Sequence, residues 1–263
     1  IMSTSPNRDA SSVPLVSIEV MPRTARGIES FRDILPGDTR LYIAHIEGTR
    51  DEDMIETARR ILGEGFSVMP HIPARLIRSR VRLESLLSAY AREGVQEALV
   101  IGGGKSEPAG SYASSMELLD TGLFSDLGFR RVHVAGHPEG NKDISSGEAT
   151  DPGLITPLAE KLDRLESEGI ESAIVTQFLF EAAPLGPWIR ALSDHGIRHP
   201  VHVGIPGPAN LASLMKFAIA CGVGPSIRVL ERRMRNLGAF VQPYHPDDLI
   251  REIRSEAAVL DAA

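Results

Sequence analysis

Short apolar runs alternate with stretches of helical periodicity along most of the chain. Seven runs have the length and the composition typical of strands, at 16–20, 41–46, 67–72, 98–101, 132–135, 173–177 and 201–205. Five stretches between them carry apolar residues three and four positions apart, which predicts amphipathic helices, at 51–64, 82–92, 156–168, 187–195 and 210–220. A glycine follows each helical stretch within two residues, and glycine is a common stop signal for helices.

This rhythm predicts an α/β protein built from repeated βα units around a parallel sheet. Seven strands favour a (β/α)8 TIM-type barrel over a doubly wound sheet, and no G-x-G-x-x-G follows the first strand. The eighth strand is the weak point, because only 240–242 could serve before a final helical stretch at 246–263. Either the barrel closes poorly or the closing strand lies beyond this sequence. We expect a disordered lead-in over 1–14 and a single barrel domain over 15–263.

Composition and charge narrow the class of protein. The chain carries 28 Lys+Arg against 35 Asp+Glu, a net charge of −7, which argues against a general nucleic-acid binder. Apolar residues make up 42 %, so general disorder is excluded. The single cysteine excludes an internal disulfide and any multi-cysteine metal site. A reducing cytoplasm is the simplest compartment. No apolar run reaches the ~18–20 residues of a membrane helix, and we expect no membrane partner.

In a barrel, chemistry is located where strands end and βα loops begin. Glu19 stands between Ile18 and Val20 in the first predicted strand. Burying a carboxylate there is costly unless it is paired or catalytic, and burial would raise its pKa until it became a proton donor near neutral pH. Other polar or glycine positions at strand ends are His45, His71, His137, Gln177 and Gly102–Gly104.

Each of these residues also has an ordinary structural reading. Glu19 could form an outward ion pair with a helix. His45 and His71 could be core histidines bonded to the backbone, and they lack the H-x-x-x-H spacing of metal ligands, so we expect no metal site. The glycine triplet could be a flexible turn. The arginines at 75, 78, 80 and 82 read as a solvated helix face.

Several segments, in order, resemble the methylenetetrahydrofolate reductase family. The stretch 17–22 (SIEVMP) is similar to its S-x-E-F-F-P motif, and 70–72 (PHI) to its P-H-[LI]-T motif. The stretch 135–140 (AGHPEG) is similar to A-G-Y-P-E-G, and 176–180 (TQFLF) to T-Q-F-F-F. Weaker matches follow at 204–206 and 216–218, so the resemblance covers roughly 16–224.

The resemblance implies a (β/α)8 barrel that interconverts 5,10-methylenetetrahydrofolate and 5-methyltetrahydrofolate with NAD(P)H and FAD. By position, Glu19 would be the catalytic acid that protonates N10. Gln177, Phe217 and Gly103 would lie at the folate, with Gln177 bonding the pterin and Phe217 packing on it. The cofactor-binding positions implied by the family are His45, His71, Gly102, Ala135 and His137.

The chain departs from the family on the flavin side. The family's R-G-D is replaced by 101–103 (IGG), and its flavin-binding lysine falls near Leu165 or Glu166. Losing two cationic partners of the flavin diphosphate would remove charge-assisted bonds worth ~1.5–3 kcal/mol each. We therefore expect weak or absent FAD, with NAD(P)H delivering hydride directly to the substrate.

Two alternatives stay open at this point. One is a catalytically degenerate folate-binding paralogue with a binding or regulatory role. The other is a phosphate-binding barrel of the aldolase type, for which no strand lysine suits Schiff-base chemistry. The expected partners are tetrahydrofolate derivatives, and a poorly closed barrel would gain from forming a homo-oligomer. The choice between NADH and NADPH and the physiological direction also stay open.

Overall fold

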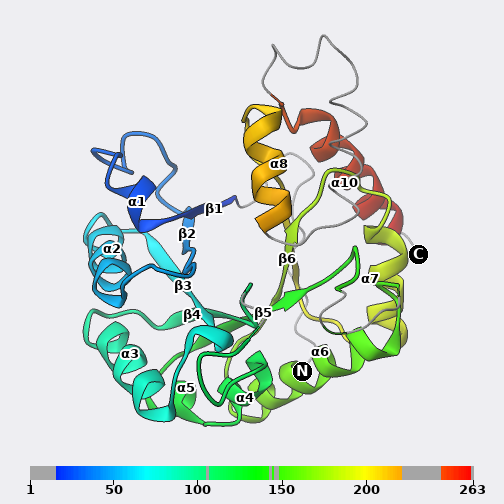
Figure 1. The fold of residues 1–263 in the computed structure, drawn as a ribbon. Coiled ribbons are helices and arrows are strands. Elements are labelled where there is room, and N and C mark those ends of the chain that lie inside the picture. The colour runs from blue at the N-terminus through cyan, green and yellow to red at the C-terminus, as the bar shows by residue number, and fades with distance from the viewer. Residues whose placement is uncertain (1–15, 105–106, 142–143, 145–147, 221–243, 262–263) are drawn as a thin grey trace, which may run out of the picture.

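A computed structural model describes residues 16–104, 107–141, 144, 148–220 and 244–261. Its centre is one curled sheet of seven parallel strands in chain order (Figure 1). The strands are β1 Ser17–Val20, β2 Arg40–Ile43, β3 Ser67–Pro73, β4 Glu97–Ile101, β5 Arg131–Gly136, β6 Ile174–Phe178 and β7 Val201–Gly204.

Helices follow the strands and surround the outside of the curl (Figure 1). They are α1 Pro22–Ala25, α2 Asp51–Gly63, the 3₁₀ helix η1 Ala74–Leu76, α3 Arg80–Arg92, α4 Ser115–Leu119, α5 Leu123–Asp126, α6 Pro152–Ser167, α7 Leu185–Asp194, α8 Leu211–Ala220 and α10 Asp247–Asp261. The prediction of repeated βα units is confirmed. Each predicted strand and each of the five periodic helices is present within a few residues of its predicted ends.

A complete eight-stranded barrel is not confirmed. β1 and β7 are the two edges of the sheet, and no described strand pairs with both of them. The predicted closing run at 240–242 and the predicted lead-in at 1–14 lie outside the described residues. What the structure shows is therefore an open, barrel-like curl, and the single-domain boundaries stay a prediction.

Alternation along the strands divides side chains between two environments. Successive side chains on a strand point to opposite faces of the sheet. On β2, Leu41 and Ile43 belong to the main core between sheet and helices, whereas Tyr42 belongs to a separate inner cluster with Met69 and Leu99. The outer helices complete the main core; α2, for example, contributes the fully buried Met54. The inner face therefore presents a different set of residues from the core, and it positions the candidate site.

Close packing on the outer face makes Gly136, at the end of β5, sensitive to substitution. A Cβ atom there would lie 2.4 Å from Ile174 Cγ2 and 2.8 Å from Trp188 Cη2. Both neighbours are fully buried core residues, so neither can move away cheaply. We expect Gly136→Ala to lower the free energy of unfolding by about 1–3 kcal/mol, measured by urea denaturation.

Gly63→Ala is the matched control for this substitution. Gly63 ends α2, and a Cβ atom there would meet nothing within 4 Å. Alanine favours helix over glycine, so this variant should be as stable as the parent or slightly more so. Equal stability of the two alanine variants would show that the packing around Gly136 is looser than described.

Candidate active site

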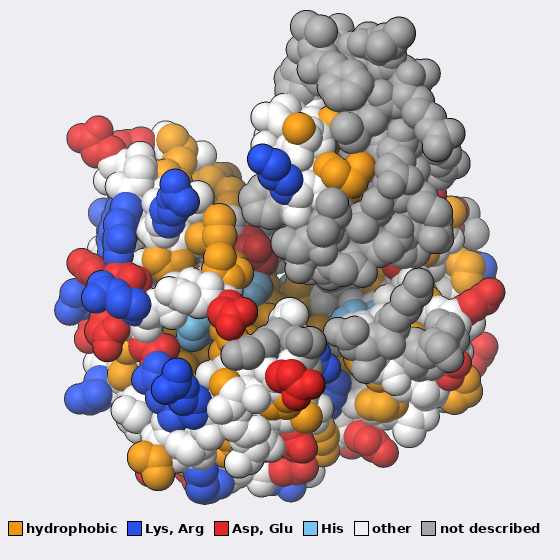
Figure 2. Space-filling model, viewed as in Figure 1, with side chains coloured by type: hydrophobic (Ala, Val, Ile, Leu, Met, Phe, Trp, Pro, Cys, Tyr) orange, Lys and Arg blue, Asp and Glu red, His pale blue; other side chains and the backbone are white. Residues whose placement is uncertain are grey.

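A carboxyl and an imidazole face each other at the carboxyl edge of the sheet. Glu19 Oε2 on β1 lies 3.5 Å from His71 Nε2 on β3. β2 runs between them, and its Tyr42 is the register partner of Glu19. The side chain of Glu19 is 62 % exposed, whereas that of His71 is only 10 % exposed. Figure 2 shows histidines and carboxylates gathered around a hollow in the middle of this face.

The surroundings shift both pKa values in ways that favour proton transfer. Desolvation by neighbouring protein atoms raises the pKa of the Glu19 carboxyl above its ordinary value of 4.5. Desolvation, assisted by repulsion from His45, lowers the pKa of His71 to about 4. His71 is therefore neutral at pH 7, and its contact with Glu19 is a polar contact rather than a full ion pair.

A second buried imidazole lies behind this pair. His45 follows β2 directly, and its Nε2 is 3.9 Å from Asp51 Oδ1 at the start of α2. Asp51 in turn forms an ion pair with Arg82 of α3. The side chain of Arg82 is 45 % exposed on α3, in line with the predicted solvated helix face, and its guanidinium also compensates the buried Asp51 carboxylate. Arg75 likewise donates from Nε to the Ala113 carbonyl.

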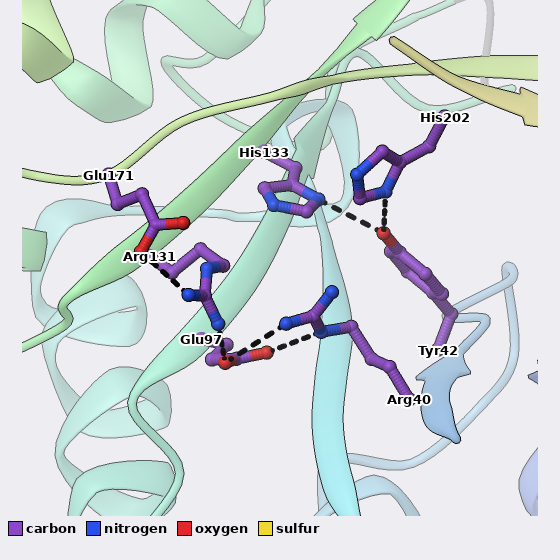
Figure 3. Close-up of polar contacts among 7 residues, drawn as sticks. All are labelled: Arg40, Tyr42, Glu97, Arg131, His133, Glu171 and His202. Carbon is purple, nitrogen blue, oxygen red and sulfur yellow. Dashed lines mark hydrogen bonds and ion pairs between the residues drawn. The ribbon is translucent and has the colours of Figure 1, made fainter. Parts of the chain in front are cut away.

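On the inner face of the sheet, one tyrosine hydroxyl lies within hydrogen-bonding distance of two imidazoles (Figure 3). Tyr42 Oη lies 3.0 Å from His133 Nδ1 of β5 and 3.3 Å from His202 Nδ1 of β7. Desolvation is the largest cause that lowers the pKa of His133, to about 2, and that of His202. A tyrosine hydroxyl has one hydrogen. With both imidazoles neutral, it donates to one and accepts from the other, so the two rings carry different tautomers.

Below this cluster, toward the amino ends of the strands, lies a chain of charges (Figure 3). Glu97 of β4 pairs with Arg40 of β2 at 2.7 Å and with Arg131 of β5 at 2.5 Å. Arg131 also pairs with Glu171 at 2.6 Å. Each cation in this chain has a carboxylate partner, and the chain ties β2, β4 and β5 together across the inside of the curl.

The remaining predicted site residues do not join Glu19 in the described contacts. Gln177 is exposed on β6, and its Oε1 accepts from the Phe178 backbone N–H at 3.0 Å. Ala135 lies on β5, in register with Val175 of β6. Phe217 lies within α8, and its side chain is outside the described part of the chain.

The glycines after β4 are held by structural contacts. The Gly102 carbonyl accepts from the Arg75 backbone N–H at 3.0 Å. Gly103 has φ +94°, and a Cβ atom on it would lie 3.1 Å from Pro73 Cβ. These contacts fasten the loop after β4 to the end of β3, which supports the structural reading of the triplet as a turn.

His137, directly after β5, lies near a lysine that sequence reasoning did not find. Desolvation, with a smaller contribution from Lys161 of α6, lowers the pKa of His137 to about 4. Desolvation also lowers the pKa of Lys161 itself. Lys161 lies on α6, one turn before residues 165–166.

The inner-face residues missed by sequence reasoning had a readable signal. Tyr42 and His133 occupy the middle of apolar runs, flanked on both sides by residues of the main core. Alternation alone places such residues opposite to the core. The sequence does not predict that residues of β5 and β7 meet the hydroxyl of Tyr42 on β2.

Among the described residues, no three His, Cys, Asp or Glu side chains are arranged to hold a metal ion. Within the same part of the chain, no helix combines the length and the apolar character needed to cross a membrane.

Comparisons with known proteins give fold-level likeness only. No model of a known protein family matches the chain. Similar solved structures include the catalytic domain of a mannanase from Streptomyces sp. SirexAA-E, at 14 % identity and TM-score 0.40, covering 71 % of this chain and 64 % of that domain. PbGH5A, a glycoside hydrolase family 5 enzyme from Prevotella bryantii B14, matches at 12 % identity and TM-score 0.31. The match covers 64 % of this chain and 74 % of that chain. The citrate synthase SbnG matches at 10 % identity and TM-score 0.34, and the match covers 80 % of this chain and 93 % of that chain.

The predicted folate oxidoreductase, and the folate-binding paralogue offered beside it, are therefore wrong. The similar structures are glycoside hydrolases and a citrate synthase, not folate reductases. Glu19 faces His71, and Gln177 Oε1 accepts from the Phe178 backbone N–H; neither contact tests the folate-binding roles predicted for these two residues. These neighbours are enzymes, and at such low similarity none of them supplies a substrate for this chain.

The shared hydroxyl of Tyr42 predicts a stability effect. Tyr42→Phe leaves the Nδ1 atoms of His133 and His202 without this partner inside the sheet. We expect the free energy of unfolding to fall by about 1–3 kcal/mol in urea denaturation. Tyr90→Phe is the control, because the buried Tyr90 hydroxyl has no hydrogen-bond partner among the described residues, and its removal should cost nothing. A Tyr42→Phe protein as stable as Tyr90→Phe would contradict the shared hydrogen bond.

The depressed pKa of His133 predicts acid sensitivity. The unfolded chain takes up a proton near the ordinary pKa of 6.5, whereas the folded chain does so only near 2. Stability contributed by neutral His133 is therefore present above 6.5 and is lost as the pH falls below it. Between about pH 7.5 and about pH 5 the loss should be about 2 kcal/mol.

His133→Gln cannot titrate, so it should show that much less loss than the parent when urea denaturation is repeated at the two pH values. His195→Gln, which replaces an exposed histidine beyond α7, should retain the parent's pH dependence. An identical pH dependence in the parent and His133→Gln would disprove the buried neutral imidazole.

Proposed function

We propose that this chain is an enzyme in which Glu19 transfers a proton to or from a small organic substrate at the carboxyl edge of the sheet. The observation that carries the proposal is the 3.5 Å contact between Glu19 and the buried His71 at that edge. In barrel-like folds this edge is the one that carries chemistry. The Glu19 side chain is also 62 % exposed, so a substrate at this edge can reach it.

Glu19 and His71 have different roles in the proposed proton transfer. Since desolvation raises the pKa of Glu19, its carboxyl holds a proton closer to neutral pH than an ordinary carboxyl does and releases it readily. Catalytic acids and bases work best when their pKa lies near the operating pH. His71, buried and neutral, orients the carboxyl without adding a charge that would lower its pKa.

The polarity of the inner face indicates the class of substrate. The arginines of the inner charge chain, Arg40 and Arg131, are both compensated by Glu97. Aromatic and imidazole rings, including Tyr42 and His71 with centroids 6.1 Å apart, line the region between that chain and the edge. This surface suits a small uncharged molecule with an apolar body and one acidic C–H or one proton-accepting atom. NAD(P)H, FAD and self-association stay predictions that no contact described above addresses.

A generic proton-abstraction substrate tests the proposal without knowledge of the natural one. 5-Nitrobenzisoxazole opens to a coloured phenolate when a base removes its C–H proton. We expect turnover whose kcat/KM rises with pH through the pKa of Glu19, at a midpoint above 4.5. Glu19→Gln should lose about 100-fold or more of this rate.

The matched control is Glu84→Gln, which removes an exposed carboxylate from α3 and changes the net charge equally. It should retain the parent's rate and pH profile. Turnover that is the same in Glu19→Gln as in the parent, or no faster than that of free acetate at equal concentration, would refute Glu19 as the proton-transfer group.

A further inference from the structure

A compensated carboxylate lies buried one layer behind the Glu19–His71 pair. Asp51 is the first residue of α2, and its side chain is only 7 % exposed. Its partner Arg82 comes from the neighbouring helix α3 and is 45 % exposed. The ion pair thus joins a partly exposed guanidinium to a buried carboxylate. Burying a carboxylate carries a desolvation penalty that an ion pair does not always offset.

His45, which is 5 % exposed, lies next to Asp51 and close enough to His71 for its charge to lower the pKa of His71. The Nδ1 atom of His45 has no hydrogen-bond partner among the described residues, and His71 Nε2 makes no hydrogen bond there beyond its 3.5 Å polar contact with Glu19. Buried polar atoms are almost always bonded. Two such atoms on neighbouring imidazoles indicate groups that are held for chemistry rather than for packing.

We propose that Asp51, fixed by Arg82, is a positioning residue: it holds His45 and sets its protonation, and the charge of His45 in turn acts on the His71 that faces Glu19. This inference rests on the proposed function, because His71, the last residue of this set, faces the Glu19 carboxyl to which proton transfer is assigned. Its parts come from consecutive segments of the chain, namely the loop after β2, the first turn of α2, β3 and α3. A folded βα unit therefore assembles it locally.

The electrostatics agree with this order. Desolvation lowers the pKa of His45; the negative charge of Asp51 and a hydrogen bond with the Thr49 backbone raise it, and the positive charge of Arg82 lowers it. Desolvation raises the pKa of Asp51, and Arg82 opposes that rise. His45 in turn is the charged group that helps to lower the pKa of His71.

Other titratable groups act on this cluster of side chains, among them Glu52 of α2, whose negative charge raises the pKa of Asp51. Glu19 faces the cluster from β1, and the Tyr42 ring lies edge-on to His71 from β2. Tyr90 of α3 lies close enough for the charge of Asp51 to raise its pKa. Both tyrosines have pKa values raised by burial and stay neutral throughout the working range.

The test is an NMR titration of the two imidazoles in ¹⁵N-histidine-labelled protein. In Asp51→Asn the anion that favours protonated His45 is gone, so the pKa of His45 should fall by about 1 unit. His71 then meets less charge on His45, so its pKa should rise. Opposite shifts of two imidazoles are not produced by a general loosening of the structure.

Asp53→Asn is the matched control, because it removes the same charge from the same turn of α2. Asp53 pairs at the surface with Arg26 and, at 2.9 Å, with Arg50. Both imidazole pKa values should stay at their parental positions in this variant. Unchanged values in Asp51→Asn, or equal shifts in Asp51→Asn and Asp53→Asn, would overturn the inference.

Arg82→Gln keeps the inference testable if Asp51→Asn does not fold. Removing the cation leaves Asp51 to act on His45 alone, so the pKa of His45 should rise, opposite in sign to the effect of Asp51→Asn. A fall or no change would count against the proposal.

The nitrobenzisoxazole assay separates the two proposals. Opposite imidazole shifts without Glu19-dependent turnover in the parent would retain the coupling and reject the proposed function. Glu19-dependent turnover whose pH midpoint is the same in Asp51→Asn as in the parent, with unshifted imidazoles, would reject the coupling alone. The coupling predicts a lower midpoint in Asp51→Asn, because both the loss of the anion and an easier protonation of His71 favour the ionised Glu19 carboxyl.

Discussion

Every second side chain of a curled parallel sheet points inward, and in this chain those positions hold ionisable groups as well as apolar ones. Buried polar groups cost free energy unless they bond to one another. The inward residues of β2 and β5 meet this constraint together: Arg40 and Arg131 share Glu97, while Tyr42 bonds His133. The inside of the curl is held by polar contacts between strands that are distant in sequence, in addition to the hydrogen bonds of the sheet.

This arrangement supports the proton transfer proposed for the carboxyl edge. The charges near the amino ends of the strands compensate one another, and the imidazoles above them are neutral because desolvation lowers their pKa values. No described cation contacts Glu19, so nothing offsets the desolvation that raises its pKa.

Much of the architecture could be predicted from the sequence, because the spacing of apolar residues and the glycines that end helices are local signals. They located all seven strands and the main helices, and they marked Glu19 and His71 as unusual residues in apolar runs. Alternation along β2 and β5 marks Tyr42 and His133 as inward-facing, but contacts across several strands leave no local trace in the sequence. The convergence of these residues, and the ion pair of Arg82 with the buried Asp51, therefore could not be predicted. The folate function was inferred from short motifs; such motifs record strand ends and turns that many barrel-like proteins share, and the comparisons contradict that function.

The central claim is that the Glu19 carboxyl is a proton carrier with a raised pKa beside a neutral His71. A ¹³C NMR titration of the glutamate side-chain carboxyls, with the Glu19 resonance assigned by its absence in Glu19→Gln, tests this directly. The structure predicts a midpoint clearly above the ordinary 4.5, with His71 still neutral there or only beginning to gain its proton. A Glu19 midpoint at or below 4.5 would contradict the account.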